Sequence, residues 1–280
     1  MIALAVTLGC ASREIGTVML IPQPVQVEVE AGFLELDDHT RIVATGDAVL
    51  VANLLAGVLR PSTGLVLEIA DDDPKRGDIA LLLEPELDLG TEGYEIEIDR
   101  KGATIRATDS AGLFWGTQTL RQLLPPRIFC ADVVKDIAWK VPCLTIRDVP
   151  RFGWRGLMLD TGHDFQHLPF ILRFIDLMAL HKFNILHWHI TDLGTWPLEI
   201  KNYPRLQDPS TRGARMMGDP KKGVKPGYYT QDQVRQVVRY AAERHITVVP
   251  EIDMPGHSTP ALIAYPEFDC PVPHKTWEWD

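Results

Sequence analysis

The sequence predicts an α/β protein in two successive parts, a small α+β domain and then alternating parallel strands and helices. Up to about residue 140, short strand-like runs surround two helical stretches. From about residue 146, near-continuous apolar runs alternate with amphipathic helices, which is typical of parallel strands buried on both faces. Two of these runs, HKFNILHWHITD (181–192) and ITVVPEIDMPGH (246–257), end in acids and histidines, and that pattern indicates an enzyme.

The first domain is expected to span residues 20–145. Its helices are expected at Asp47–Leu59 and Ser110–Leu124, with Ser110 as the N-cap of the second, which the following prolines terminate. Its strands are expected at Val25–Val29, Thr40–Ala44, Leu65–Ile69, Ile79–Leu83, Tyr94–Ile98 and Ala103–Ala107. The pattern favours a sheet with helices on one face, and we interpret this domain as a scaffold without chemistry of its own.

The second part, residues 146–280, is expected to begin a barrel. Strands are predicted at Gly156–Asp160, Asn184–Ile190 and Ile246–Asp253, and helices at His167–Leu180 and Gln231–Arg244. This order implies right-handed crossovers and a parallel sheet. Three strands cannot close a (β/α)8 TIM barrel, whose domain takes about 250 residues. We therefore expect an incomplete barrel, limited to its first three strands, and a chain that is the front part of a longer protein.

Composition restricts the function classes. The content of hydrophobic residues (45%) and of charged residues (24%) is ordinary for a soluble globular protein of one or two domains. The formal net charge of −10 argues against nucleic acid or an acidic membrane surface as partner, because both require basic patches. No apolar run reaches the length of about 18 residues that a membrane helix needs, so no membrane span is expected.

Residues 1–19 are a candidate signal or a disordered leader. The apolar stretch Ile2–Leu8 precedes Gly9 and Cys10, as at the end of a secretion signal or at a lipoprotein cleavage site, but no Lys/Arg region comes before it. With a signal the protein would be periplasmic, extracellular or lipoprotein-anchored, and otherwise cytoplasmic.

The four cysteines show no CxxC spacing, which argues against a zinc site built from them. We predict that they are free thiols of the small, buried kind. A Cys130–Cys143 pair is the alternative in an oxidising compartment.

The candidate site residues lie at the ends of the second and third predicted strands of the barrel. His187 and His189 stand two positions apart and therefore point to the same side of their strand, and Asp192 lies just beyond it. An HxH pair with an Asp is also the metal-ligand signature of amidohydrolases built on barrels, which is one alternative interpretation. On the third strand, Glu251 precedes an MPGH turn that can direct His257 back over the strand ends.

Five segments together resemble glycoside hydrolase family 20, the β-N-acetylhexosaminidases. They are RGLMLD (155–160), HWHITD (187–192), YYTQDQVRQVVRYAAERHI (228–246), PEIDMPGH (250–257) and, upstream, EGYEIEI (92–98). The resemblance covers about nine tenths of the chain.

This resemblance implies a fold, a reaction and a set of roles. The expected activity is release of N-acetyl-β-hexosamine from glycans or glycoconjugates by a retaining mechanism that uses the 2-acetamido group of the substrate, without metal or cofactor. Asp192 and His257 would form a relay behind the acid/base Glu, while Asp160, His163 and Trp196 would bind the sugar. The adjacent Asp-Glu pair of the family stands in a Gly-Gly-Asp-Glu-like motif that these 280 residues do not contain. The chain is therefore expected to be inactive alone.

The sequence also departs from the family pattern. His163 stands where family members usually carry an Arg that binds ring hydroxyls, and histidine lacks the planar, permanently charged donor fork of arginine. After Asp192, the usual acid and Arg are replaced by Leu193 and Pro197. Trp196 is kept and could face a sugar or only pack its loop. Because the Asp-Glu pair is missing from these 280 residues, a non-catalytic carbohydrate-binding homologue is a second alternative, beside the metal-dependent amidohydrolase.

Overall fold

The computed structural model describes residues 18–208 and 227–270, and it divides the chain into two units, Met1–Arg151 and Phe152–Asp280. Residues 1–17 of the expected leader, with Cys10, lie outside the described residues. Each unit is described by itself below. Within the described ranges, no helix is both long enough and apolar enough to cross a membrane.

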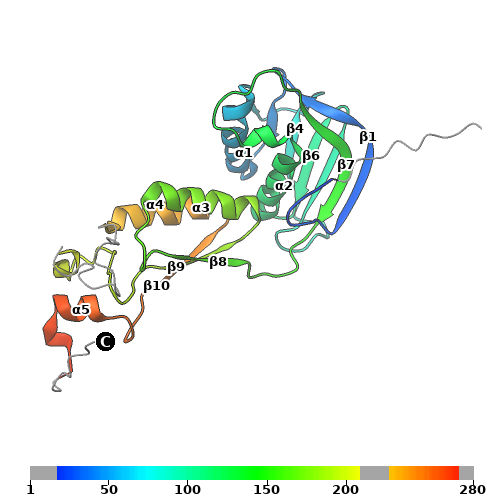
Figure 1. Ribbon diagram of the computed structural model, residues 1–280. Helices are drawn as coiled ribbons and strands as arrows, with labels where there is room; N and C mark the ends of the chain where they lie inside the picture. The colour runs from blue at the N-terminus through cyan, green and yellow to red at the C-terminus, as the bar shows by residue number, and fades with distance from the viewer. Residues whose placement is uncertain (1–17, 209–226, 271–280) are drawn as a thin grey trace, which may run out of the picture. The chain divides into compact units, whose positions relative to one another are not determined.

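The first unit is built on a seven-stranded sheet in the order β1-β7-β5-β6-β4-β2-β3 (Figure 1). Neighbours from β1 to β6 are antiparallel, and those from β6 to β3 are parallel. The strands are β1 (Gln26–Leu36), β2 (Ile42–Ala44), β3 (Ile69–Ala70), β4 (Ile79–Leu83), β5 (Tyr94–Asp99), β6 (Gly102–Ala107) and β7 (Trp139–Asp148).

Helices α1 (Ala48–Thr63) and α2 (Ser110–Leu123) pack against each other over one face of this sheet, with the short 3-10 helix η1 (Pro126–Phe129) following α2. The predicted cap of α2 was one residue too late: the side chain of Asp109 accepts the backbone N–H of Gly112 at 2.7 Å, so Asp109 is the N-cap. Within α2, Gly116 lies against the sheet, where a β-carbon would stand 2.5 Å from the side chain of Ile105.

Strand β3 is shorter than predicted and begins later. Leu67 has a φ of +47°, a left-handed conformation that a β-strand does not contain. The guanidinium of Arg60 holds this segment by donating to the carbonyl oxygens of Val66 and Leu67 at 2.8 and 3.0 Å. Ladder pairing therefore starts only at Ile69.

Strand β7 was not predicted, and it carries the first unit past the expected boundary at residue 145. It pairs with both β1 and β5 and alternates buried and exposed side chains, as a strand with one covered face does. Its Pro142 lies opposite Phe33, where the register of β1 shifts. The hydroxyl of Tyr94 on β5 donates to Asp148 at 2.8 Å and lies 2.7 Å from Thr119 of α2, so one buried hydroxyl joins both strands to the helix.

The second unit contains, among the described residues, a parallel three-stranded sheet in the order β10-β9-β8, as predicted. Its helices α3 and α4 pack against each other, and Asp176 of α3 accepts hydrogen bonds from Tyr240 and Arg244 at 2.8 Å each. Thr230 caps α4 through a reciprocal capping box with Gln233. The elements are β8 (Gly156–Asp160), α3 (Leu168–Leu180), β9 (Ile185–His189), η2 (Pro204–Gln207), α4 (Gln231–Ala242), β10 (Thr247–Glu251), α5 (Thr259–Ala264) and η3 (Pro266–Phe268).

The register of this sheet places the last residues of its three strands side by side. Asp160 of β8 and Glu251 of β10 both pair with His189 of β9, so the three side chains project from one face in a single row. On the opposite face, Trp188 is fully buried, and its indole N–H donates to the hydroxyl of Thr161 at 2.9 Å. This hydrogen bond joins the end of β9 to the residue that follows β8, on the face opposite the row of site residues.

The described cysteines agree with the prediction of free thiols. Cys130, Cys143 and Cys270 are unpaired, and only Cys143 is buried. The predicted burial is therefore right for Cys143 and wrong for the other two.

Candidate functional site

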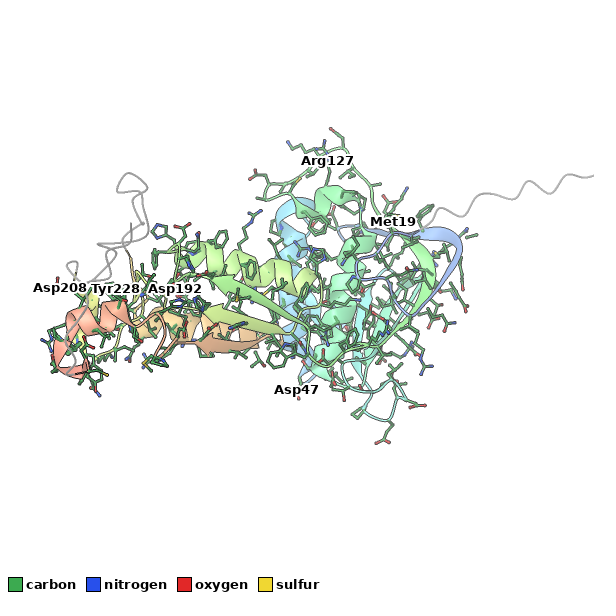
Figure 2. All side chains as sticks on the ribbon, turned by 60° about the horizontal axis from the view of Figure 1, so that its bottom comes forward. Met19, Asp47, Arg127, Asp192, Asp208 and Tyr228 are labelled. Atoms are coloured by element: carbon green, nitrogen blue, oxygen red, sulfur yellow. The ribbon has the colours of Figure 1, made fainter. Side chains whose placement is uncertain are left out.

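Asp192 is the centre of the candidate site. It lies beyond the end of β9 (Figure 2), and its side chain is only 3% exposed. Its Oδ2 accepts from Nε2 of His189 at 2.8 Å, and its Oδ1 accepts the backbone N–H of Leu193 at 2.5 Å. Burial raises the pKa of Asp192, but these two hydrogen bonds outweigh it and bring the pKa below its ordinary value. The site therefore holds a buried, ionised carboxylate.

His189 lies between two carboxylates. Its Nε2 faces Asp192, and its Nδ1 stands 3.0 Å from Oε2 of Glu251. Burial lowers the pKa of His189, but the hydrogen bonds to both acids outweigh it and raise the pKa. The same oxygen of Glu251 lies 2.6 Å from Nε2 of His187. Glu251 thus bridges the two histidines of the HxH pair.

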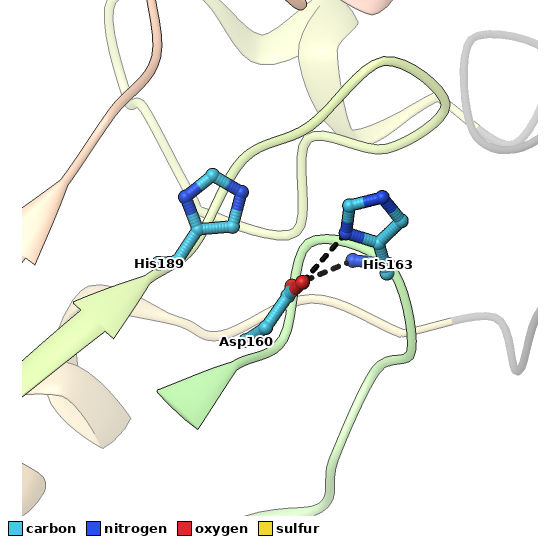
Figure 3. Close-up of side chains that lie close together, drawn as sticks. All are labelled: Asp160, His163 and His189. Atoms are coloured by element: carbon cyan, nitrogen blue, oxygen red, sulfur yellow. Dashed lines mark hydrogen bonds and ion pairs between the residues drawn. The ribbon is translucent and has the colours of Figure 1, made fainter. Parts of the chain in front are cut away.

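His163 approaches the site from the loop that follows β8. Its Nδ1 lies 2.6 Å from Oδ2 of Asp160 and 3.3 Å from Oδ2 of Asp192, and its backbone N–H donates to Oδ1 of Asp160 at 2.9 Å. Figure 3 shows Asp160 between the two imidazoles of His163 and His189. The loop passes close to Asp192 because residue 162 is glycine: a β-carbon there would stand 2.9 Å from that of Asp192.

His257 comes back over the strand ends, as the MPGH turn predicted. Its closest partner is Asp253, whose Oδ2 lies 2.6 Å from Nδ1. Oδ2 of Asp192 is 3.7 Å from the same nitrogen, an ion-pair distance without a direct hydrogen bond. The two residues of the predicted relay, Asp192 and His257, are therefore neighbours without a hydrogen bond between them. The hydrogen-bonding partner of His257 is Asp253.

Trp196 packs against other side chains of this unit. It is 6% exposed and lies in a cluster with Leu206, Ala264 and Tyr265, and its indole N–H has no partner among the described residues. In this arrangement its ring is covered by protein side chains, so the expected stacking against a sugar has no support from the packing.

Asp160, His163 and His189 form a group in which one ligand atom from each lies within 4.8 Å of the others. His187 is not a member of this group, because its imidazole faces Glu251. The two imidazoles of the HxH pair both face Oε2 of Glu251, at 2.6 Å and 3.0 Å, so this oxygen occupies the point on which they converge.

Comparison with known proteins identifies the family. The family model described as "Glycosyl hydrolase family 20, catalytic domain" matches residues 152–280, and the one described as "Glycosyl hydrolase family 20, domain 2" matches residues 17–149. The chain belongs to glycosyl hydrolase family 20. This membership rules out the amidohydrolase alternative and agrees with the observed α/β architecture.

Family 20 proteins of known name are similar over most of the chain. A beta-hexosaminidase of Porphyromonas gingivalis is 41% identical over 90% of this chain and 32% of that protein. A beta-hexosaminidase of Vibrio furnissii is 35% identical over 92% of this chain and 41% of that protein. The solved GH20 beta-N-acetylhexosaminidase of Streptomyces coelicolor A3(2) superposes with a TM-score of 0.80 at 40% identity, over 90% of this chain and 49% of that one. The chain thus spans between about a third and a half of these relatives.

Within this family 20 site, four of the five predicted residues lie together: His163 and His257 both approach Asp192, and His163 is also bonded to Asp160. The sequence analysis gave no catalytic or sugar-binding role to His189 or Glu251, which connect that group to His187. The signal was present in the HWH spacing and in Glu251, since both histidines face the strand end at which Glu251 lies.

Proposed function

We propose that the protein carrying this chain is a β-N-acetylhexosaminidase that removes terminal N-acetyl-β-hexosamine from glycans or glycoconjugates. The observation that carries the proposal is the buried, ionised Asp192 with three imidazoles around it at the ends of parallel strands. The names of the similar proteins and the family 20 membership support the substrate class. No cofactor or metal is needed for this reaction.

In the proposed reaction the acetamido oxygen of the substrate attacks its own anomeric carbon, and the glycosidic bond to the leaving oxygen breaks. The acid/base Glu protonates that oxygen and afterwards takes a proton from a water molecule, whose oxygen attacks the anomeric carbon and breaks its bond to the acetamido oxygen. By the resemblance, this Glu stands in a motif outside these 280 residues. Asp192 is a positioning residue, because its negative charge orients the imidazoles around it, and His257 would pass this bias to the acid/base Glu.

Asp160 and His163 are the proposed sugar-binding groups of this chain. Both are more exposed than Asp192, with 32% and 56% of the side chain accessible, and together they present carboxylate and imidazole atoms to solvent next to the strand ends. A carboxylate accepts hydrogen bonds from sugar hydroxyls, and an imidazole can donate or accept one. The pair would bind ring hydroxyls without the fixed positive charge of the usual Arg.

The test compares two chromogenic substrates with the protein that carries this chain: a 4-nitrophenyl N-acetyl-β-glucosaminide and the matching β-glucoside without the acetamide. Turnover of the first and not of the second is expected, since the acetamide supplies the attacking oxygen. Saturable binding of the first substrate without any turnover would replace this proposal by the non-catalytic carbohydrate-binding homologue. Equal turnover of both would refute substrate assistance.

A further inference from the structure

The loop after β8 brings a metal-ligand set together that the sequence analysis did not predict. Asp160, His163 and His189 each offer one ligand atom within 4.8 Å of the others, and they combine one carboxylate with two imidazoles. These are ligand types that Zn²⁺ and similar divalent transition metals bind at about 2.0–2.2 Å. The third member of the set, His163, is the residue that replaces the usual Arg of the family.

The distances suit a tetrahedral ion after small side-chain movements. Two ligand atoms that each stand about 2.1 Å from a tetrahedral metal lie about 3.4 Å apart. Nδ1 of His163 is now 2.6 Å from Oδ2 of Asp160, a hydrogen bond whose proton a metal would replace. The side chain of His163 is 56% exposed, and it can make the shift of about 0.8 Å that a tetrahedral ion requires.

A second observation concerns His189. Metal-binding histidines almost always donate their other ring N–H to a carboxylate, which fixes the ring and strengthens it as a ligand. Nδ1 of His189 already faces Oε2 of Glu251 at 3.0 Å. The other ring nitrogen of His189, Nε2, lies 2.8 Å from Oδ2 of Asp192, and Nδ1 of His163 lies 3.3 Å from the same oxygen. Glu251 thus occupies the place of the outer carboxylate behind a metal-bound His189.

We propose that Asp160, His163 and His189 bind a divalent transition-metal ion, with Zn²⁺ as the ion of best fit. Asp192 stands beside the fourth position, since its Oδ2 lies 2.8 Å and 3.3 Å from the two imidazoles. The ion would replace the proton between His163 and Asp160 and the one between His189 and Asp192, releasing them to solvent. Binding of the ion does not rest on the proposed function, whereas its competition with the sugar does.

Metal and sugar would then compete for the same groups. Asp160 and His163 cannot hold an ion and also bond to ring hydroxyls, so Zn²⁺ bound here would exclude the sugar. The metal is thus an inhibitor of the site, and its removal by a chelator frees it.

The test uses the protein that carries this chain, freed of metal by dialysis against a chelator. Zn²⁺ binding is measured by titration calorimetry, and Co²⁺ is added as a probe, since tetrahedral Co²⁺ absorbs visible light intensely. The variants are His163→Arg, which keeps a polar side chain that does not bind metals, and Glu251→Gln, which removes the charge of the carboxylate behind His189 and His187. The control is His181→Ala, an exposed histidine of the same unit that lies outside the set.

One Zn²⁺ per chain is expected, with loss of the Co²⁺ absorption in His163→Arg and affinity lower by about 10–100-fold in Glu251→Gln. The His181→Ala control should bind like the parent. The proposal is overturned if the parent binds no metal, or if His163→Arg binds Zn²⁺ as tightly as the parent and the control. Circular dichroism of each variant separates a lost ligand from a lost fold: if His163→Arg is misfolded, His163→Ala replaces it under the same criteria.

Discussion

Replacing Asp192 by Asn tests the centre of the proposed catalytic site. Asn keeps the size of the side chain and removes its charge, so the contact with His189 Nε2 at 2.8 Å loses its ionic character, as do the approaches of His163 and His257 at 3.3 and 3.7 Å. A hydrogen bond to a charged group contributes about 1.5–3 kcal/mol. At about 1.4 kcal/mol for each factor of ten, the His189 contact alone corresponds to a fall of roughly 10–100-fold in kcat.

The assay is steady-state hydrolysis of the chromogenic N-acetyl-β-glucosaminide by the protein that carries this chain. KM should change little, because the buried Asp192 contacts histidines and not the ground-state sugar. Asp164→Asn is the matched control: it is an exposed acid two residues from Gly162, and a surface change of this kind should alter kcat by about twofold at most. If Asp192→Asn is folded and its kcat equals that of the control, Asp192 has no role in positioning the catalytic groups.

Three further predictions concern the scaffold and the chain. Gly116→Ala should destabilise the first unit by about 1–2 kcal/mol through overpacking, whereas Gly57→Ala on α1, with open space around it, should stabilise it by about 0.5–1 kcal/mol; denaturant unfolding measures both. Tyr94→Phe should cost about 1–3 kcal/mol in the same assay, because Asp148 loses a buried donor, and an unchanged midpoint would contradict this. Residues 1–280 alone should show no turnover of the chromogenic substrate, since loss of a general acid costs about 10²–10⁴-fold; turnover would place the acid within this chain.

The sequence predicted the elements with strong periodicity and the strand ends that carry the site. The apolar runs before Asp160, His189 and Glu251 could be recognised as strands because parallel strands need no polar face, although β8 and β10 are mostly exposed or half-buried. Strand β7 was missed because a proline argues against a central strand; Pro142 lies next to the register shift in β1 and beyond the residues that pair with β5, so it is tolerated there.

Contacts between distant segments could not be predicted in the same way. Trp196 is an amphipathic ring that suits either a sugar face or a protein core, and only the positions of Leu206 and Tyr265 decide between them. The preference of His257 for Asp253 over Asp192 likewise depends on how the turn after β10 is folded. The residue types in the sequence predicted which chemical groups the site contains. The contacts of those groups depend on tertiary packing, which the sequence pattern does not give.

The row formed by Asp160, His189 and Glu251 has a consequence for how such a site changes during evolution. Neighbouring strands lie about 4.8 Å apart, a spacing that backbone hydrogen bonds maintain whatever the side chains are. The backbone therefore fixes these three positions relative to one another. A substitution at one of them changes the side-chain chemistry at that position without displacing the other two. His163 differs, since it is held by a loop and by its contact with Asp160. Substitutions in the loop can therefore change the ligand specificity of the site while the three strand-end positions keep their spacing. Related proteins with the same fold can in this way bind different ligands.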